Sequence, residues 1–508
     1  MSSVECMVNF TNVVTANPAI WFASPYESTM QPLLATASEA EKGSFVLAGV
    51  LVSLIVIYLS AKLFGELCAR INLPPVLGEL LGGVVVGVSV LKLIVFPESL
   101  GEGADSLIVS FLQATAGLDP EISTSVFESQ SEVISVLSEL GVILLLFEIG
   151  LESDLKELIR VGPQAAIVAV VGVVAPFALG TAGLIALFNV ATIPAVFAGA
   201  ALTATSIGIT AKVLAEIQQL STKEGQIIIG AAVLDDVLGI IVLAVVASLA
   251  KTGEIDVLNI VYLIGGAAAF LVGAILIGRL ISPYFVALVD RMETRGELIL
   301  SSLVFAFVLS YIASAIQLEA ILGAFAAGLI LAETDKRKEL EEQVVPIADM
   351  FVPIFFVVVG AGTDLSVLNP AVPSNREGLI MALFLIAIAI VGKVITGFTV
   401  FGQGNINRLA IGVGMVPRGE VGLVFAGVGS ASGVLSESLE AAIIVMVIMT
   451  TFLAPPMLRF VFQDGEEDAT ADMGSAALEG ANGQAMDASS SDGSGGEAVE
   501  SVQESSSS

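Results

Sequence analysis

Histidine is absent from this 508-residue chain, and cysteine occurs only twice, as Cys6 and Cys68. Without imidazole, any proton chemistry must use carboxylates, and any pH sensing must proceed without histidine. Two cysteines exclude a disulfide framework. Charged residues make up only 14% of the chain, and the net charge of −30 argues against nucleic acid or an anionic lipid surface as a partner.

Apolar residues are abundant instead. The chain is 56% hydrophobic with a mean hydropathy of +0.94, and apolar runs of roughly 20 residues, each long enough to cross a bilayer core, recur along most of its length. The sequence therefore predicts an all-α polytopic membrane protein. We count thirteen crossings, at approximately 45–66, 76–96, 133–152, 163–188, 192–216, 225–250, 258–282, 297–317, 320–333, 348–363, 377–400, 407–430 and 437–462.

Positive charge is distributed unevenly between the two sets of connecting segments. One set carries only Lys42, Lys92, Lys251 and Arg376. The other carries fourteen basic residues: Lys62, Arg70, Lys156, Arg160, Lys212, Lys223, Arg279, Arg291, Arg295, Lys336, Arg337, Lys338, Arg408 and Arg459. Because cytoplasmic loops carry an excess of Lys and Arg, the second set is predicted to be cytoplasmic. The N-terminus is then outside and the C-terminus is inside, in a plasma membrane or an internal energy-coupling membrane.

Three segments lie outside the predicted spans. Residues 1–44 form an extracytoplasmic segment without a cleavable signal peptide. The outer loop 97–132 holds seven acids and no Lys or Arg, and it is either a solvated loop or a weak cation funnel. Residues 463–508 are expected to form an acidic, disordered cytoplasmic tail. The chain offers no segment for an appended nucleotide-binding domain.

Two parts of the membrane region resemble each other. NLPPVLGELLGGVVVG (72–87) aligns with QLEAILGAFAAGLILA (317–332), and GLESDL (150–155) aligns with GAGTDL (360–365) in the same order. The copies are seven crossings apart, an odd number, so they must have opposite orientations. Inverted repeats of this kind are typical of secondary transporters, which bind substrate near the midplane where the repeats meet.

The same offset pairs the crossings 192–216 and 407–430, which are both poor continuous helices. The first contains GAALTATSIGIT (199–210), and the second contains GVGMVPRGEVGLV (412–424). Proline removes a backbone donor and glycine weakens a helix, so an interruption is expected at Pro417–Gly419. Broken spans are tolerated only where they line a cavity or an ion site. The sequence thus predicts two discontinuous helices, of which one lies next to the crossing 225–250 and the other, from the second repeat, faces that crossing.

The run GAAVLDDVLGIIVL (230–243) places Asp235 and Asp236 in the middle of a span, and the residues from Gln226 to Ala250 include no other ionisable group. A charge at this depth costs roughly 3 kcal/mol, so it normally faces protein or water and has a role. Adjacent helical residues point about 100° apart. We therefore expect one aspartate to bind an ion and the other to be held by a counter-charge; two aspartates that only cap or cross-link helices are the alternative.

Further polar residues fall within or near the spans. Lys393 is the natural counter-charge, although its side chain could instead extend toward the cytoplasmic interface. If Lys393 pairs with Asp235, cation binding could release the lysine proton, and two protons would then exchange for one cation. The hydroxyls of Thr203, Thr205 and Ser206 could bind a hard cation or satisfy the broken backbone of their own helix. The charge pair Arg418 and Glu420 could neutralise the ends of the half-helices. Glu79 and Glu148 are predicted at the cytoplasmic mouth.

Five motifs in order resemble the monovalent cation:proton antiporter superfamily, and most closely its double-aspartate, NapA-like branch of sodium/proton antiporters: ALTATSIGITAKVL, GAAVLDDVLGIIVL, PIFFVVVGAGTDL, GKVITG and GMVPRGEVGLVF. The likeness covers about residues 45–462. It implies the thirteen-helix antiporter fold with two crossed broken helices, a homodimer, and a core domain (around 163–250 and 377–462). The resemblance further implies that this core would slide in elevator fashion against a dimerisation domain (around 45–152 and 258–363).

The resemblance also implies roles for single residues. Asp236 would be the principal Na⁺ carboxylate, Asp235 would partner Lys393, and Thr203 would be the ion-site threonine of the broken helix. We expect a transporter rather than an enzyme, with no cofactor and no nucleotide, that exchanges Na⁺ or Li⁺ for H⁺. A K⁺/H⁺ antiporter, a cation channel, a sodium-coupled symporter and a non-transporting receptor are the alternatives. Cation preference, stoichiometry and host membrane are left open by the sequence.

Overall fold

A computed structural model of the chain describes residues 25–97, 106–117, 119–252, 257–371, 373–402 and 406–489. Within these ranges the regular secondary structure is helical, without a strand. Nine of the described helices are long and apolar enough to cross a membrane: α2 (Pro25–Arg70), α6 (Pro120–Glu152), α7 (Leu155–Phe188), α10 (Lys223–Thr252), α11 (Val257–Val289), α12 (Glu297–Ala315), α14 (Arg337–Ala361), α15 (Pro373–Gly397) and α18 (Glu437–Ser489).

Shorter helices complete the membrane region. They are α3 (Pro75–Val86), α8 (Thr192–Ala201), α9 (Ile207–Glu216), α13 (Ala320–Leu331), α16 (Arg408–Gly414) and α17 (Glu420–Ala431), with α5 (Leu107–Ala116) and the 3₁₀ turn η3 (Leu365–Leu368) in connecting segments. Every predicted crossing overlaps a helix or a pair of half-helices. The count of thirteen is not established, because several of these helices are too short to cross alone. The second crossing, predicted over 76–96, ends as a helix at Val86, where Gly87 forms the C-cap with an extended backbone.

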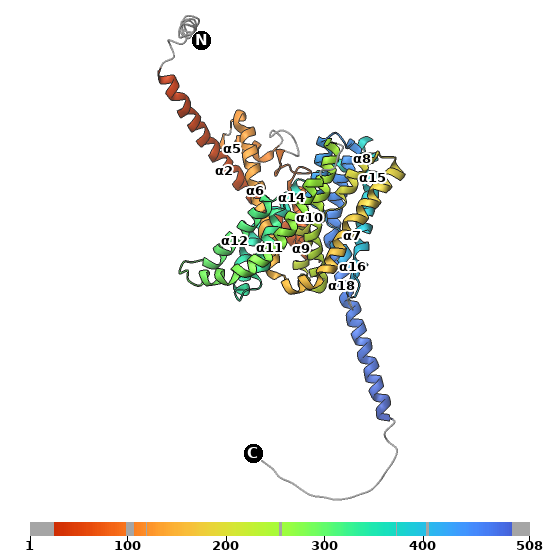
Figure 1. Ribbon diagram of the computed structural model, residues 1–508. Coiled ribbons are helices and arrows are strands. Elements are labelled where there is room, and N and C mark those ends of the chain that lie inside the picture. The colour runs from red at the N-terminus through yellow and green to blue at the C-terminus, as the bar shows by residue number, and fades with distance from the viewer. Residues whose placement is uncertain are drawn as a thin grey trace, which may run out of the picture.

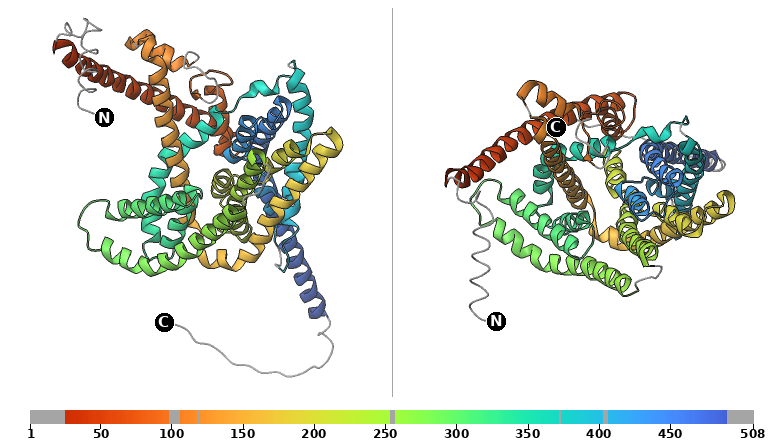
Figure 2. Two further views of the ribbon diagram at one scale, coloured as in Figure 1. Left: turned by 45° about the horizontal axis from the view of Figure 1, so that its top comes forward. Right: turned by 90° about the horizontal axis from the view of Figure 1, so that it is seen from above.

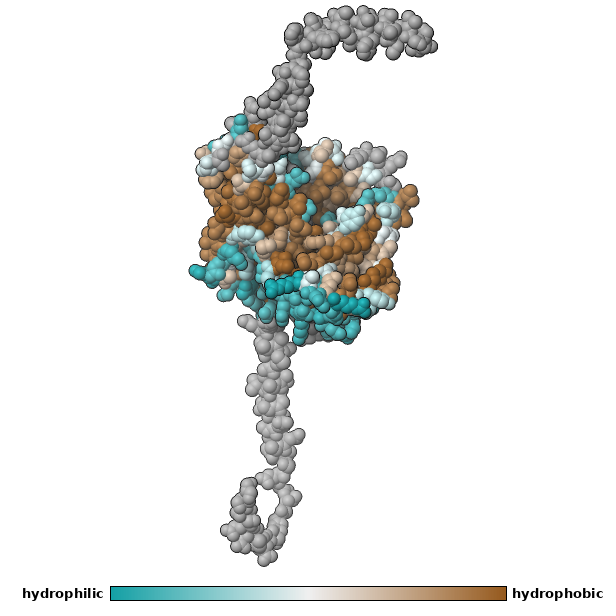
Figure 3. Space-filling view, turned by 90° about the vertical axis from the view of Figure 1, so that its left-hand side faces the viewer, coloured by the Kyte–Doolittle hydropathy of each residue, from teal (hydrophilic) through white to brown (hydrophobic). Residues whose placement is uncertain are grey.

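Large apolar side chains form a broad band across the face shown in Figure 3, and the hydrophilic residues of that face gather mostly along its lower edge. On α11 and α12 these side chains are widely exposed, with Leu258 at 81% and Tyr311 at 75%. In water such a surface would be a large aggregation-prone patch, whereas in lipid it is the expected surface. The protein is therefore an integral, multi-pass membrane protein.

The helices pack in two groups that lie side by side (Figures 1 and 2). We call the first group the scaffold group; it comprises α2, α3, α5, α6 and α11–α14, and the pairs α13–α6, α14–α6 and α3–α14 pack most extensively within it. The second, the core group, comprises α7–α10 and α15–α18, with α15–α18 and α10–α7 as its main pairs. The two groups meet where α9 lies against α6 and α3, where α10 lies against α11, and where α18 lies against α3.

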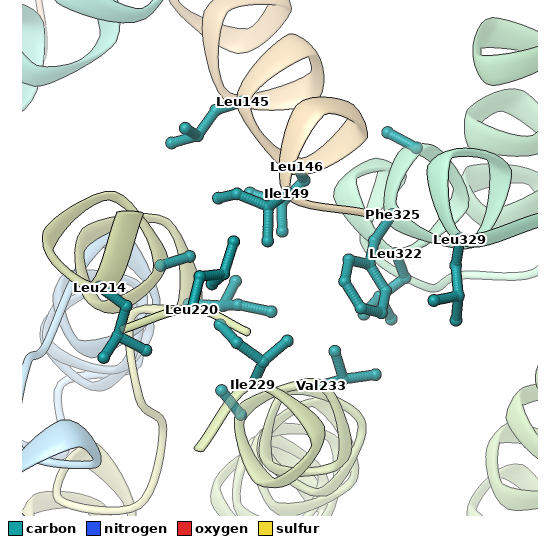
Figure 4. Packing of buried hydrophobic residues seen from close by; sticks show 14 of the residues in the cluster. Leu145, Leu146, Ile149, Leu214, Leu220, Ile229, Val233, Leu322, Phe325 and Leu329 are labelled. Carbon is teal, nitrogen blue, oxygen red and sulfur yellow. The ribbon is translucent and has the colours of Figure 1, made fainter. Parts of the chain in front are cut away.

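Leucine, isoleucine and phenylalanine side chains fill the junction between the groups. Figure 4 shows Leu145, Leu146 and Ile149 of α6 pointing toward Leu214 of α9 and Ile229 of α10 on one side and toward the α13 side chains on the other. These residues belong to the largest buried cluster, while a second cluster lies within the core group on α8, α15, α17 and α18. Apolar contacts are not directional, and no hydrogen bonds must break when they shift. This junction therefore does little to fix the position of one group of helices relative to the other.

Both ends of the described chain are helical beyond the predicted spans. α2 begins at Pro25, and α18 continues to Ser489, whereas the sequence predicts a disordered tail from residue 463. The segment 464–489 contains seven alanines, and alanine is the strongest helix former, which favours continuation of α18. Residues 1–24 and 490–508 of the predicted terminal segments lie outside the described residues.

Candidate ion-binding site

Two broken helices cross at the centre of the core group. The chain between α8 and α9 leaves helical structure over Ala204–Ser206, and the chain between α16 and α17 does so over Val416–Gly419. The breaks satisfy each other's backbone: the Ser206 amide donates to the Pro417 carbonyl at 2.8 Å, and the Thr205 hydroxyl donates to the Met415 carbonyl at 3.1 Å. Both interruptions that the sequence predicted are thus present, and they face each other.

Asp235 and Lys393 form a buried ion pair beside this crossing. Lys393 Nζ lies 3.2 Å from Asp235 Oδ2 and 3.3 Å from Oδ1, and both side chains are fully buried. Lys393 therefore does not extend to the membrane interface. Gly172 of α7 makes room for the ammonium, since a Cβ there would lie 3.2 Å from Nζ.

Arg418 is also fully buried, at the break between α16 and α17. Its Nη1 donates to the Ala204 carbonyl in the opposite break, and its own carbonyl accepts a hydrogen bond from the Thr451 hydroxyl of α18. The carbonyls near the C-terminal end of α8 carry partial negative charge, which a guanidinium neutralises. Among the described residues, Nε and Nη2 of Arg418 have no hydrogen-bond partner. The side chain of Glu420 lies outside the described residues.

Asp236 faces a different space from Asp235. It is 6% exposed and lines a cavity of about 20 Å³, which is room for one water-sized particle. Thr205, Ser206 and Gly419 of the two breaks line the same cavity, together with Glu319 of the scaffold group. A carboxylate beside hydroxyl and carbonyl oxygens is a donor set that suits a hard cation.

The three predicted hydroxyls separate into two kinds. Thr205 and Ser206 line the cavity of Asp236. Thr203 is fully buried, is not among the lining residues, and donates its hydroxyl to the Ala200 carbonyl at 2.7 Å. In this conformation Thr203 satisfies the backbone of its own helix, so its role as an ion ligand stays a prediction.

A large vestibule of about 1290 Å³ adjoins the small cavity, and both are lined by Val142, Glu319, Ile321, Phe355 and Gly419. The vestibule extends along α6 to Glu139, Glu132 and Glu128, toward the face that the charge distribution predicts to be outside. Asp364 also lines it, and none of the described residues that line it is Lys or Arg. The space that leads to Asp236 is thus acidic.

At the opposite face the two groups are in direct contact. The Val76 amide at the start of α3 donates to both carboxylate oxygens of Glu216 at the end of α9, at 3.2 and 3.4 Å. Lys212, one turn earlier on α9, is close enough to Glu79, Glu148 and Glu216 to interact electrostatically with each of them. Glu79 and Glu148, which we predicted at the cytoplasmic mouth, therefore lie at this contact.

Sequence reasoning missed three residues that the structure brings to the site or to this contact: Glu319, Thr451 and Glu216. Glu319 lies within the repeat that the sequence reveals, in QLEAILG, but its partner in the alignment is Pro74, so the acid carries no repeat signal. Thr451 and Glu216 act through tertiary contacts that no local pattern indicates.

Inverted repeats, two crossed broken helices and buried charges at the crossing define a secondary transporter by architecture. A family model for sodium/hydrogen exchangers, transmembrane, matches residues 51–464. The chain belongs to this family, and hence to the cation:proton antiporter superfamily that its motifs resemble.

Individual relatives agree with this assignment. The chain is 69% identical over 449 residues to the high-affinity Na⁺/H⁺ antiporter NhaS3 of Synechocystis, a match that covers 88% of this chain and 97% of that one. It is 33% identical to the Na⁺/H⁺-K⁺ antiporter GerN of Bacillus cereus, over 80% of this chain and 94% of the relative. The solved structure of the sodium proton antiporter MjNhaP1 from Methanocaldococcus jannaschii matches with a TM-score of 0.55 at 16% identity, covering 83% of this chain and 98% of that one, and shows the same fold.

Proposed function

We propose that the protein is a secondary antiporter that exchanges Na⁺, and also Li⁺, for H⁺ across its membrane. The observation that carries the proposal is the placement of Asp236 in a cavity of one-particle size at the end of an acidic vestibule. One carboxylate in this position binds either a cation or a proton, because the cation requires the ionised form and the proton neutralises it. The names of the relatives NhaS3 and GerN support Na⁺ and H⁺ as the substrates.

Asp235 and Lys393 would couple a second proton to the cycle. The ion pair holds Asp235, which precedes Asp236 on α10, against Lys393 of α15, so cation binding at Asp236 changes the electric field on the lysine. If the lysine then releases its proton, two protons exchange for one cation and transport is electrogenic. Turnover that does not respond to membrane potential in proteoliposomes would contradict this stoichiometry.

Transport would proceed by an elevator-like movement of the core group against the scaffold group. The apolar junction between the groups supports sliding, and the vestibule together with the Glu216–Val76 contact supports the interpretation of the present state as open to the predicted outside. The scaffold group would also form a homodimer interface. K⁺/H⁺ exchange is the second candidate function, because the name of GerN includes K⁺.

The test uses everted membrane vesicles with a pH-sensitive dye and additions of Na⁺, Li⁺, K⁺ or choline. Dequenching with Na⁺ but not with choline is the expected result, and the half-saturating Na⁺ concentration should fall as the pH rises, since fewer protons then compete for Asp236. Asp236→Asn should abolish the signal while the protein remains folded and membrane-inserted. Cation flux without proton counterflow would instead indicate a channel.

A further inference from the structure

Glu319 connects the outer vestibule to the cavity of Asp236. Among the described residues that line both spaces, it alone has an ionisable side chain; the others are Val142, Ile321, Phe355 and Gly419. A cation that enters from the vestibule must pass this carboxylate before it reaches Asp236. Glu319 is half-buried, so it is partly desolvated yet still accessible from the vestibule.

The position of Glu319 in the fold places its carboxyl group beside a helix N-terminus. It occupies the N-cap of α13, a helix of 12 residues. The N-terminal end of a helix carries partial positive charge, which stabilises a carboxylate there. A fixed negative charge at the mouth of a cavity that also contains Asp236 attracts a monovalent cation and lowers the penalty for shedding part of its water shell.

Glu319 and Asp236 belong to different groups of helices. Asp236 lies on α10 of the core group, and Glu319 lies on α13 of the scaffold group. In the inverted repeat the residue that aligns with Glu319 is Pro74, so the opposite face has no carboxylate at the equivalent position. A movement of the core group would therefore take Asp236 away from Glu319 without bringing it to an equivalent acid.

We propose that Glu319 is a cation-contacting residue of the outer face, which receives the cation from the vestibule and passes it to Asp236. This rests on the proposed antiport function. Its effect is one-sided: Glu319 strengthens cation capture when the site is open to the outside and has no part in capture from the cytoplasm.

The experiment compares the two faces of the membrane. Everted vesicles present the cytoplasmic face to the bath and right-side-out vesicles present the outer face; in each, Na⁺-driven proton flux gives the half-saturating Na⁺ concentration. We expect Glu319→Gln to raise the outer-face value by roughly tenfold, which corresponds to about 1.4 kcal/mol of lost cation binding. The cytoplasmic-face value should not change. Glu319→Asp, which keeps the charge on a shorter side chain, should give a smaller shift at the outer face only.

The matched control is Glu132→Gln, which removes a vestibule carboxylate that does not line the cavity of Asp236. It should change the outer-face value much less than Glu319→Gln. An equal shift at both faces, no shift at either face, or an equal effect of Glu132→Gln would overturn the proposal. In each of these cases the antiport function would still stand if the wild type shows Na⁺-driven proton flux and Asp236→Asn abolishes it. If the wild type shows no Na⁺-driven proton flux, the function itself is rejected.

Discussion

The carboxylate of Asp235 and the ammonium of Lys393 form an ion pair from which solvent is fully excluded. Removing one partner of such a pair leaves an uncompensated buried charge, which costs about 3–5 kcal/mol, whereas replacing both partners by neutral groups costs much less. Lys393→Gln and Asp235→Asn should therefore each lower the free energy of unfolding strongly, and the two substitutions together should recover much of the loss. Thermal unfolding of detergent-solubilised protein measures the double-mutant cycle. Single effects that simply add would show that the pair does not interact.

Gly172 provides a second test at the same pair. A side chain at this position meets Lys393 Nζ, whereas Gly162 on the same helix has open space around it. Gly172→Val should displace the ammonium and reduce transport severalfold, and Gly162→Val should leave transport near the wild-type rate. Initial rates of Na⁺-driven proton flux in everted vesicles, normalised to the amount of folded protein, compare the two. Equal rates would show that Lys393 tolerates displacement.

Some residues of the site can be identified from the sequence because their burial contradicts their chemistry. Asp235, Asp236, Lys393 and Arg418 are charged residues in long apolar runs, and the structure buries all four. Thr203 illustrates the limit, since a hydroxyl in a broken helix can point to an ion or bond to its own backbone, and only coordinates distinguish the two.

Close contacts between helices at two glycines explain why glycine recurs at the same position of the sequence repeat. A Cβ on Gly83 of α3 would lie 2.3 Å from the Val357 carbonyl oxygen of α14, and a Cβ on Gly328 of α13 would lie 2.2 Å from the Phe147 carbonyl oxygen of α6. Gly83 and Gly328 align in the repeat, and α3 and α13 each pack against a helix of the opposite repeat. The repeat is thus maintained in sequence where backbones approach too closely for any side chain.

The two glycine contacts predict similar losses of stability when either glycine is replaced. Gly83→Ala and Gly328→Ala should each destabilise the protein by about 1–3 kcal/mol or more, because the obstructing atoms are backbone and cannot rotate away. Gly266→Ala on α11 is the control, since nothing lies within 4 Å of its added methyl group. Apparent melting temperatures in detergent measure all three. A neutral effect at Gly83 together with a large one at Gly328 would contradict the equivalence of the two contacts.

Breaks, charges and repeats at the helix level are visible in the sequence, whereas helix ends are less so. Pro417 and its neighbouring glycines indicate the break before α17 correctly, because proline and glycine act locally. The sequence does not predict that α3 ends at Val86, because the apolar run continues past that residue. It also does not predict that α18 extends to Ser489, because acidic residues begin within the helix and favour a disordered tail.

The relative position of the two groups of helices is a property of the whole molecule that no sequence pattern specifies. It depends on the apolar junction and on polar contacts at the face opposite to the vestibule. One of these contacts, the hydrogen bond from the Val76 amide to Glu216, joins the scaffold group to the core group. This bond closes the face opposite to the vestibule. It can exist only while α9 lies against α3, so it stabilises the conformation in which Asp236 communicates with the predicted outside.

Removing the Glu216 carboxylate should therefore shift the molecule away from this conformation. A hydrogen bond to a charged group contributes about 1.5–3 kcal/mol, which corresponds to roughly a tenfold to hundredfold change in the ratio of the two conformations. Leu423 of α17 lines the vestibule and is 41% exposed, so Leu423→Cys reports this opening in a background with Cys6 and Cys68 replaced by serine. A membrane-impermeant thiol reagent added outside should label it readily, and more slowly after Glu216→Ala. Glu216→Gln keeps an acceptor for the Val76 amide and should give an intermediate labelling rate. If Glu216→Ala is labelled as fast as the parent protein or faster, the contact does not stabilise the outward-open state.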